Sequence, residues 1–272
     1  MRVDFWGVRG TVVASGKDRV KYGGHTICSS LSISDKEVIV IDAGTGIKKL
    51  GDKLIEKIGK GPFHIYLLLT HFHLDHITGL PFFAPLYSPH AVLTVYAPSS
   101  PQESQNYLEK IMSGRFFPID FEETPSRKFF KKIPEDGFKI GQVFISACPL
   151  HHPQGSVAYR LQKGEQSLVL ATDTEHPEKG MDKRLASFVN QTDVLVYDAM
   201  FTPEEYESGR KGWGHSTWLA GTEIAQAAGV QSLYLSHFNP NHSDKIIDAS
   251  IALSKDKFPR TFGAREGQSV IF

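Results

Sequence analysis

Three histidines and one aspartate within six residues are the side chains in this sequence best suited to chemistry. They form the pattern His-x-His-x-Asp-His, as His71, His73, Asp75 and His76, directly after the apolar run 65–70. Polar groups are rarely placed at the end of a buried strand unless they bind something. Imidazole together with carboxylate is a donor set that suits zinc, iron or manganese. We therefore expect a metal-dependent enzyme.

Further donors of the same kind follow other apolar runs along the chain. His151 and His152 follow the run 143–148, Asp173 follows 167–171, and His237 follows 232–235. Functional groups of α/β proteins gather where strands end. We therefore expect donors from these strand ends to join the cluster at 71–76.

The elements that must position these residues alternate between strands and helices throughout the chain. Strands are predicted at 2–8, 27–34, 38–42, 63–69, 91–97, 143–148, 156–161, 167–171, 194–197 and 232–235, and helices from 47, over 101–112, from 181 and over 216–228. Residues 113–136 lack a clean period and are interpreted as a loop or insertion near the site. No linker divides the sequence, so we predict a single domain over 1–272.

Composition limits the choice of partners. The chain has 272 residues, and its 30 basic and 30 acidic side chains balance, so no long-range field favours nucleic acid. Cys28 and Cys148 form no CxxC pair and are expected to be buried. Neither a signal peptide nor an apolar run of membrane-spanning length is found. We expect a cytoplasmic protein without a membrane partner.

Taken together, these motifs resemble the metallo-β-lactamase superfamily over nearly the whole chain. The segments 171–174 (Ala-Thr-Asp-Thr), 214–217 (Gly-His-Ser-Thr) and 235–238 (Leu-Ser-His-Phe) resemble its ribonuclease Z and cyclic-phosphodiesterase branch, and the segments 5–10, 22–26 and 42–46 resemble a bacterial group within it. The resemblance implies an α/β fold, a four-layer αβ/βα sandwich with two central mixed β-sheets.

The resemblance also implies two divalent metal ions, zinc or manganese, with iron as a third candidate. His152 is preferred to His151 because the segment His152-Pro-Gln-Gly-Ser resembles the His-Pro-x-Gly turn of the family. The implied ligands are His71, His73 and His152 for one metal, Asp75, His76 and His237 for the other, and Asp173 as the bridge.

His215, in the Gly-His-Ser-Thr segment, is the strongest catalytic candidate outside the ligand set. In the resembling phosphodiesterases this histidine contacts the phosphate or protonates the leaving oxygen, and we group it with Asp75 and Asp198 as catalytic. Ribonuclease Z usually carries His-Glu-Ala-Thr where this chain has Tyr-Asp-Ala-Met at 197–200. Asp198 either orients His215 or caps a strand end, and both interpretations stay open.

Three residues are candidates for substrate contact besides His215. Arg9 lies in a Gly-Val-Arg-Gly turn from which a guanidinium could pair with phosphate. His25 follows two glycines, and Asn239 lies in the turn after His237. Ordinary turn chemistry explains all three equally well.

The expected function is that of a dinuclear metallohydrolase acting on cyclic nucleotides or another small phosphodiester, with a hydroxide shared by two metals as the nucleophile. The alternatives are ester, lactone or thioester hydrolysis, tRNA 3′ processing, and a non-catalytic nucleotide-binding module. The run 127–132 mixes cations with aromatics, as nucleic-acid binders do, but an ordinary strand explains it equally well. Nucleic acid is therefore not favoured as a partner, and a homodimer is expected by analogy alone.

Overall fold

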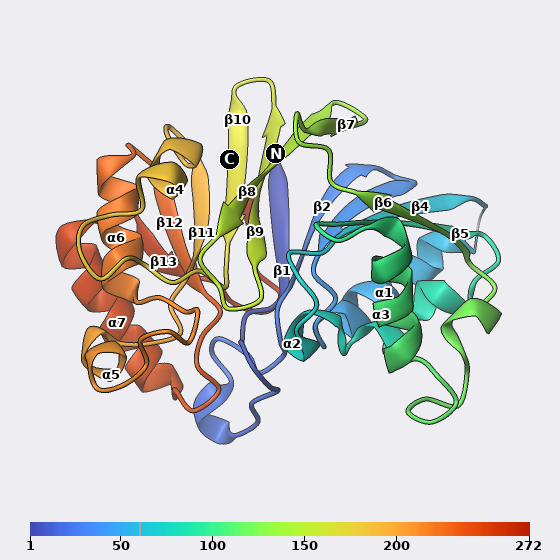
Figure 1. Ribbon diagram of the computed structural model, residues 1–272, viewed down its shortest axis with the longest axis horizontal. Coiled ribbons are helices and arrows are strands. Elements are labelled where there is room, and N and C mark those ends of the chain that lie inside the picture. The colour runs from blue at the N-terminus through green and yellow to red at the C-terminus, as the bar shows by residue number, and fades with distance from the viewer. Residues whose placement is uncertain (60) are drawn as a thin grey trace.

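The computed structural model of the protein describes residues 1–59 and 61–272, arranged in four layers. Two mixed sheets pack face to face in the middle, and helices cover the outer face of each (Figure 1). The predicted αβ/βα sandwich with two mixed sheets is confirmed.

The first sheet has seven strands in the order β14-β1-β2-β3-β4-β5-β6. Pairing is antiparallel from β14 to β3 and parallel from β3 to β6. The strands are β1 Arg2–Gly7, β2 Cys28–Ser34, β3 Glu37–Ile41, β4 Phe63–Leu68, β5 Ala91–Ala97, β6 Arg127–Lys132 and β14 Ser269–Ile271.

The second sheet repeats this plan in the order β13-β12-β11-β10-β9-β8-β7. Pairing is antiparallel from β7 to β10 and parallel from β10 to β13. The strands are β7 Phe138–Ile140, β8 Val143–Leu150, β9 Ser156–Lys163, β10 Gln166–Ala171, β11 Val194–Asp198, β12 Ser232–Ser236 and β13 Thr261–Gly263.

Helices cover the outer faces. On the first sheet lie α1 Ile47–Ile58 and α3 Pro101–Ile111, and on the second α4 Lys183–Phe188, α6 Trp218–Ala227 and α7 Asp244–Lys257 (Figure 1). The short α2 Leu74–Ile77 and α5 Pro203–Glu207 belong to loops, as do the 3₁₀ turns Lys17–Arg19, Leu80–Phe82, Ala84–Tyr87 and Phe121–Glu123. Among the described residues, no helix is both long and apolar enough to span a membrane.

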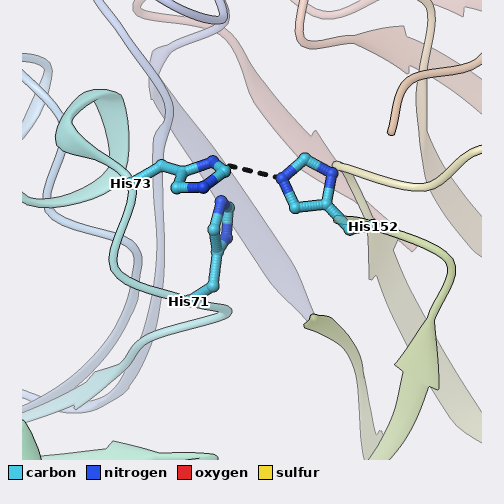
Figure 2. Close-up of side chains that lie close together, drawn as sticks. All are labelled: His71, His73 and His152. Carbon is cyan, nitrogen blue, oxygen red and sulfur yellow. Dashed lines mark hydrogen bonds between the residues drawn. The ribbon is translucent and has the colours of Figure 1, made fainter. Parts of the chain in front are cut away.

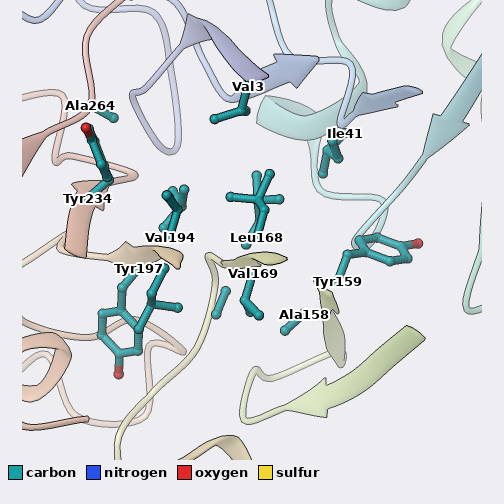
Figure 3. Packing of buried hydrophobic residues seen from close by; sticks show 14 of the residues in the cluster. Val3, Ile41, Ala158, Tyr159, Leu168, Val169, Val194, Tyr197, Tyr234 and Ala264 are labelled. Atoms are coloured by element: carbon teal, nitrogen blue, oxygen red, sulfur yellow. The ribbon is translucent and has the colours of Figure 1, made fainter. Parts of the chain in front are cut away.

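The main core lies between the two sheets. Val3 and Ile41 of the first sheet pack in the same cluster as Tyr159 and Leu168 of the second (Figure 3). A separate cluster joins the outer face of the first sheet to α1 through Ile47 and its neighbours. The shared core supports our proposal that residues 1–272 form a single domain.

The interpretation of 113–136 as a loop is wrong for residues 127–132, where the alternative of an ordinary strand is confirmed. These form β6, which pairs parallel to β5 at the edge of the first sheet. Phe130 packs against the α1-side core while Lys131 and Lys132 are exposed, an arrangement that protects an edge strand from pairing with other chains. The partner strand lies thirty residues earlier in the chain, so local periodicity alone does not reveal this pairing.

Candidate metal centre

The predicted metal ligands come together where the strands of both sheets end. His71, His73 and His152 form one group, in which one ring nitrogen from each residue lies within 4.8 Å of the others. Figure 2 shows the three rings turned toward a common point, with His73 Nδ1 3.1 Å from His152 Nε2. His71 and His73 follow β4, whereas His152 follows β8, so both sheets contribute to this group.

A second group is buried beside the first and consists of Asp75, His76, Asp173 and His237. Asp173 Oδ2 lies 3.1 Å from His76 Nε2 and 3.3 Å from His237 Nε2. Asp75 Oδ2 lies 3.3 Å from His237 Nε2. Four donor atoms thus surround one small volume, as a divalent cation requires.

Asp173 lies between the two groups. Its Oδ1 is 3.9 Å from His71 Nε2 in the first group, while its Oδ2 faces His76 and His237 in the second. One carboxylate therefore offers an oxygen to each group, which is the arrangement that a bridging ligand needs.

Four of the ring nitrogens that point away from the centre are held by hydrogen-bond partners. Such partners fix the orientation and tautomer of a ligating imidazole. The four pairs are His71 Nδ1 with Thr70 Oγ1 at 3.0 Å, His73 Nε2 with Gln154 Oε1 at 2.9 Å, His152 Nδ1 with the Gly214 carbonyl at 2.9 Å, and His76 Nδ1 with Asp42 Oδ2 at 2.8 Å.

The atoms that face the centre, in contrast, include several that lack hydrogen-bond partners. In the described part of the chain, the buried atoms without one include His71 Nε2, His76 Nε2, His237 Nε2 and Asp173 Oδ2. Buried polar atoms are normally satisfied, so inward-facing donors of this kind call for a cation. The residues present therefore fit a pair of divalent metal ions.

The pKa values of His71 and Asp173 agree with ligands ready to bind cations, whereas the carboxylates of Asp173 and Asp42 outweigh burial and raise the pKa of His76 above its usual range. Burial, reinforced by the neighbouring His76, lowers the pKa of His71 to about 2, so its imidazole is neutral and keeps a free lone pair. Burial opposes ionisation of Asp173, but the adjacent His237 and His76 outweigh it and hold the pKa of Asp173 well below its usual range. Neutral imidazole and ionised carboxylate are the forms that bind metal.

The backbone at two of these ligands is strained. Asp173 and His237, which follow β10 and β12, both have φ of 57°, in the left-handed region that non-glycine residues rarely adopt. Strain of this kind costs about 1 kcal/mol or more and is concentrated at functional sites. Space is equally tight, because a Cβ at Gly10 would lie 2.3 Å from the His237 ring and one at Gly214 would lie 2.3 Å from His152 Nδ1.

Asp198 contacts His215, which supports the orienting role. Its Oδ2 lies 3.0 Å from His215 Nδ1 and also accepts a hydrogen bond from the backbone N–H of Asp173 at 2.9 Å. Its Oδ1 accepts from the backbone N–H groups of Met200 and Ser216. Burial opposes the charged form of His215, but the carboxylates of Asp198 and then Asp173 outweigh it and raise the pKa of His215 to about 9.

A cavity of about 600 Å³ opens beside the centre. Its lining includes Asp75 and His215 from the predicted catalytic set and Asn239 from the predicted substrate contacts. None of residues 113–136 lines this cavity among the residues that the structure describes. His151 points elsewhere, with its exposed ring 3.5 Å from Asp182, which supports the choice of His152.

The expectation that Arg9 contacts phosphate is wrong. Its side chain is fully buried and donates from Nε to the carbonyl of Gly23 and from Nη1 to those of Asn239 and His242. A guanidinium occupied in this way joins two loops and has no surface to offer a ligand.

His25 is not brought into the cavity either. Its Nδ1 lies 3.1 Å from Thr45 Oγ1, and its backbone N–H donates to the carboxylate of Glu266. Among the described residues that line the cavity, His25 is absent. Contact between His25 and a substrate is therefore unsupported.

Sequence reasoning missed several contributors to the site. Asp42 is buried against His76 and Thr70, and its position directly after a β-strand was a usable signal. Glu175 holds the loop before His215 through the backbone N–H groups of Gly212 and Gly214. Nothing in the local sequence marks Glu175 for this role.

Residues 38–238 match the family described as the beta-lactamase superfamily domain. The chain belongs to this superfamily. Ribonuclease Z of Oceanobacillus iheyensis is 23% identical over 252 residues, which cover 74% of this chain and 79% of that protein. Exodeoxyribonuclease WalJ of Streptococcus pneumoniae is 26% identical over 229 residues, which cover 78% of this chain and 77% of that protein.

The fold is that of the superfamily as well. The metallo-β-lactamase fold protein YhfI of Bacillus subtilis superimposes with a TM-score of 0.74 at 18% identity, covering 99% of this chain and 98% of that one. The predicted superfamily, the ribonuclease Z-like branch and the class of metal-dependent hydrolase are confirmed. Divalent metal ions follow from the fold and the donor groups together.

Proposed function

We propose that this superfamily member is a phosphodiesterase that holds two divalent cations, zinc or manganese. The observation that carries the proposal is Asp173, which presents one oxygen to each of two donor groups. Two curated relatives named as nucleases support phosphodiester bonds over lactams or thioesters. The proposed ligands are those predicted from the sequence: His71, His73, His152, Asp75, His76, Asp173 and His237.

When bound, a pair of such cations would acidify a water molecule and neutralise charge on a phosphate in an in-line displacement. The chain's own contribution is proton transfer. His215 lines the cavity, and Asp198 accepts from its Nδ1–H, so Nε2 is the nitrogen left to face a substrate. We assign His215 the protonation of the leaving oxygen and Asp198 the orientation of the ring, while Asp75 completes the second donor group.

The substrate proposed is small, of the size of a nucleotide. The cavity volume of about 600 Å³ falls within the usual range for small ligands. Asn239 supplies a polar group on its wall, and the neutral net charge provides no field for a long polyanion. A cytoplasmic location and a homodimer stay predictions.

Cleavage of nucleic acid, including tRNA 3′ processing, is the second candidate, because both relatives carry the names of nucleases. It requires the end of a strand to enter the same cavity. The two candidates differ in the length of substrate that the protein turns over.

The test is a substrate panel with zinc- or manganese-loaded protein. It contains thymidine 5′-p-nitrophenyl phosphate, cyclic nucleotides, single-stranded DNA, a precursor tRNA, an aryl ester and a lactone, with Asp173→Ala as the control variant. We expect turnover of the small phosphodiesters that is lost in the variant. Turnover of the ester or lactone alone would refute the proposal, and turnover of the polymers alone would select the second candidate.

A further inference from the structure

We infer that Trp213 is a stacking platform for the nucleobase of the substrate, so that the site prefers nucleotide phosphodiesters to base-free ones. The inference rests on the proposed phosphodiesterase function and names the substrate class of the same site. It depends on where Trp213 lies, how the chain holds it and what accompanies it.

Trp213 is exposed, and it lies in the lining of the cavity beside the metal centre. Its side chain is 55% accessible, whereas Trp6 and Trp218 are 8% and 7% accessible. It lines the same cavity as Asp75, Asp173 and His215. An indole offers a large, flat apolar surface on which any base can stack.

The loop holds the indole in place without burying it. Glu175 accepts hydrogen bonds from the backbone N–H groups on both sides of Trp213, from Gly212 at 2.6 Å and from Gly214 at 2.8 Å. The ring of Phe201 meets the indole edge to face, with centroids 6.4 Å apart. A side chain fixed beforehand loses little entropy when a ligand stacks on it.

Arg210 gives this platform a positive charge. Its guanidinium lies over the indole, 4.6 Å from the ring centroid, and it lines the cavity too. An aromatic face next to an arginine is the combination with which proteins hold unpaired nucleotides. The charge also favours a ligand that carries phosphate.

The position of Trp213 along the chain indicates which base would stack. Trp213 precedes His215 by two residues, a span of at most about 7 Å along the backbone. Both rings also pack against Phe201, with centroid distances of 6.4 Å for Trp213 and 6.0 Å for His215. We therefore expect a base on Trp213 to belong to the nucleoside bonded to the phosphate that His215 serves.

Binding is tested first, by tryptophan fluorescence of the metal-loaded protein. Adenosine 5′-monophosphate and ribose 5-phosphate carry the same phosphate with and without a base. We expect the monophosphate to quench the fluorescence and ribose 5-phosphate to leave it unchanged. The quenching should be absent in Trp213→Ala and present in Phe116→Ala, which removes an exposed aromatic ring outside the cavity lining. Equal quenching in Trp213→Ala would overturn the inference.

Turnover is tested next with two esters that share a p-nitrophenolate leaving group. These are thymidine 5′-p-nitrophenyl phosphate and methyl p-nitrophenyl phosphate. We expect Trp213→Ala to raise KM for the thymidine ester about 5- to 160-fold, the range that stacking of one base provides, and to leave KM for the methyl ester unchanged. Trp213→Phe should restore most of the difference, and thermal unfolding checks that both variants are folded.

The two proposals fail in different ways. If the native protein hydrolyses both esters and Trp213→Ala changes neither KM, the stacking inference is overturned and the phosphodiesterase proposal stands. If the native protein hydrolyses neither ester and no cyclic nucleotide, the phosphodiesterase proposal fails, and the fluorescence titration still decides whether a base stacks on Trp213.

Discussion

Replacing Asp198 with asparagine tests the proposed proton donor most directly. The carboxylate is fully buried and accepts four hydrogen bonds, from His215 Nδ1–H and from the backbone N–H groups of Asp173, Met200 and Ser216. An asparagine oxygen replaces only one of its two oxygens. The amide NH₂ group then faces two donors that have lost their acceptor.

The number of hydrogen bonds lost in Asp198→Asn determines how far the free energy of unfolding falls. A hydrogen bond to a charged group is worth about 1.5–3 kcal/mol, so the loss of two lowers the free energy of unfolding by about 3–6 kcal/mol. A general acid contributes about 10²- to 10⁴-fold to rate, so kcat should fall within that range when His215 loses its orientation. Chemical denaturation and steady-state kinetics measure the two quantities.

The dependence on leaving group separates a lost proton donor from general damage. Hydrolysis of a dinucleotide expels one nucleoside as an alkoxide, which needs protonation, whereas p-nitrophenolate leaves without it. We expect Asp198→Asn and His215→Ala to lose activity on the dinucleotide far more than on thymidine 5′-p-nitrophenyl phosphate.

A double-mutant cycle then asks whether Asp198 acts through His215. In a His215→Ala background, Asp198→Asn should no longer change the ratio of the two rates. Equal losses on both substrates in the single variants, or additive losses in the double variant, would refute this reasoning.

Three further predictions concern the metals and the buried arginine. Chelation should abolish hydrolysis and lower the free energy of unfolding, by about 2.7 kcal/mol for each metal site relative to protein at a free metal concentration 100-fold above Kd; an unchanged denaturation midpoint would contradict this. His152→Ala should lose one of two metals by mass spectrometry, whereas His151→Ala should retain both, and the reverse result would exchange their roles. Arg9→Lys should lower the free energy of unfolding by about 3 kcal/mol, because at least one charged hydrogen bond to a carbonyl is lost. KM should stay unchanged, and a raised KM would restore a role in phosphate binding.

The candidates for metal ligands could be found because they follow apolar strands, and the resemblance to the superfamily then assigned the proposed ligands among them. A strand end such as that before Asp173 or His237 is visible in the sequence, and parallel strands bring their ends to one edge of a sheet. An apolar strand followed by His or Asp therefore predicts which residues meet at this edge of the sheets.

Arg9, β6 and Glu175 could not be placed in this way. The carbonyls that accept hydrogen bonds from Arg9 belong to residues as far away as His242. The strand that pairs with β6 ends thirty residues before β6 begins. Glu175 meets Gly212 and Gly214 only after the chain has folded. Each of these roles depends on contacts between distant segments, which periodicity and motif spacing do not encode.

The donor groups draw on both halves of the sandwich, and this has a consequence for the order of folding. His71 follows β4 of the first sheet and Asp173 follows β10 of the second, so these residues, 102 positions apart, become neighbours only when the two sheets have docked. Contacts so distant in sequence are slow to form. Affinity for metal should thus appear in the last kinetic phase of refolding, and a chelating dye that competes for zinc would report the moment at which the two sheets lock together.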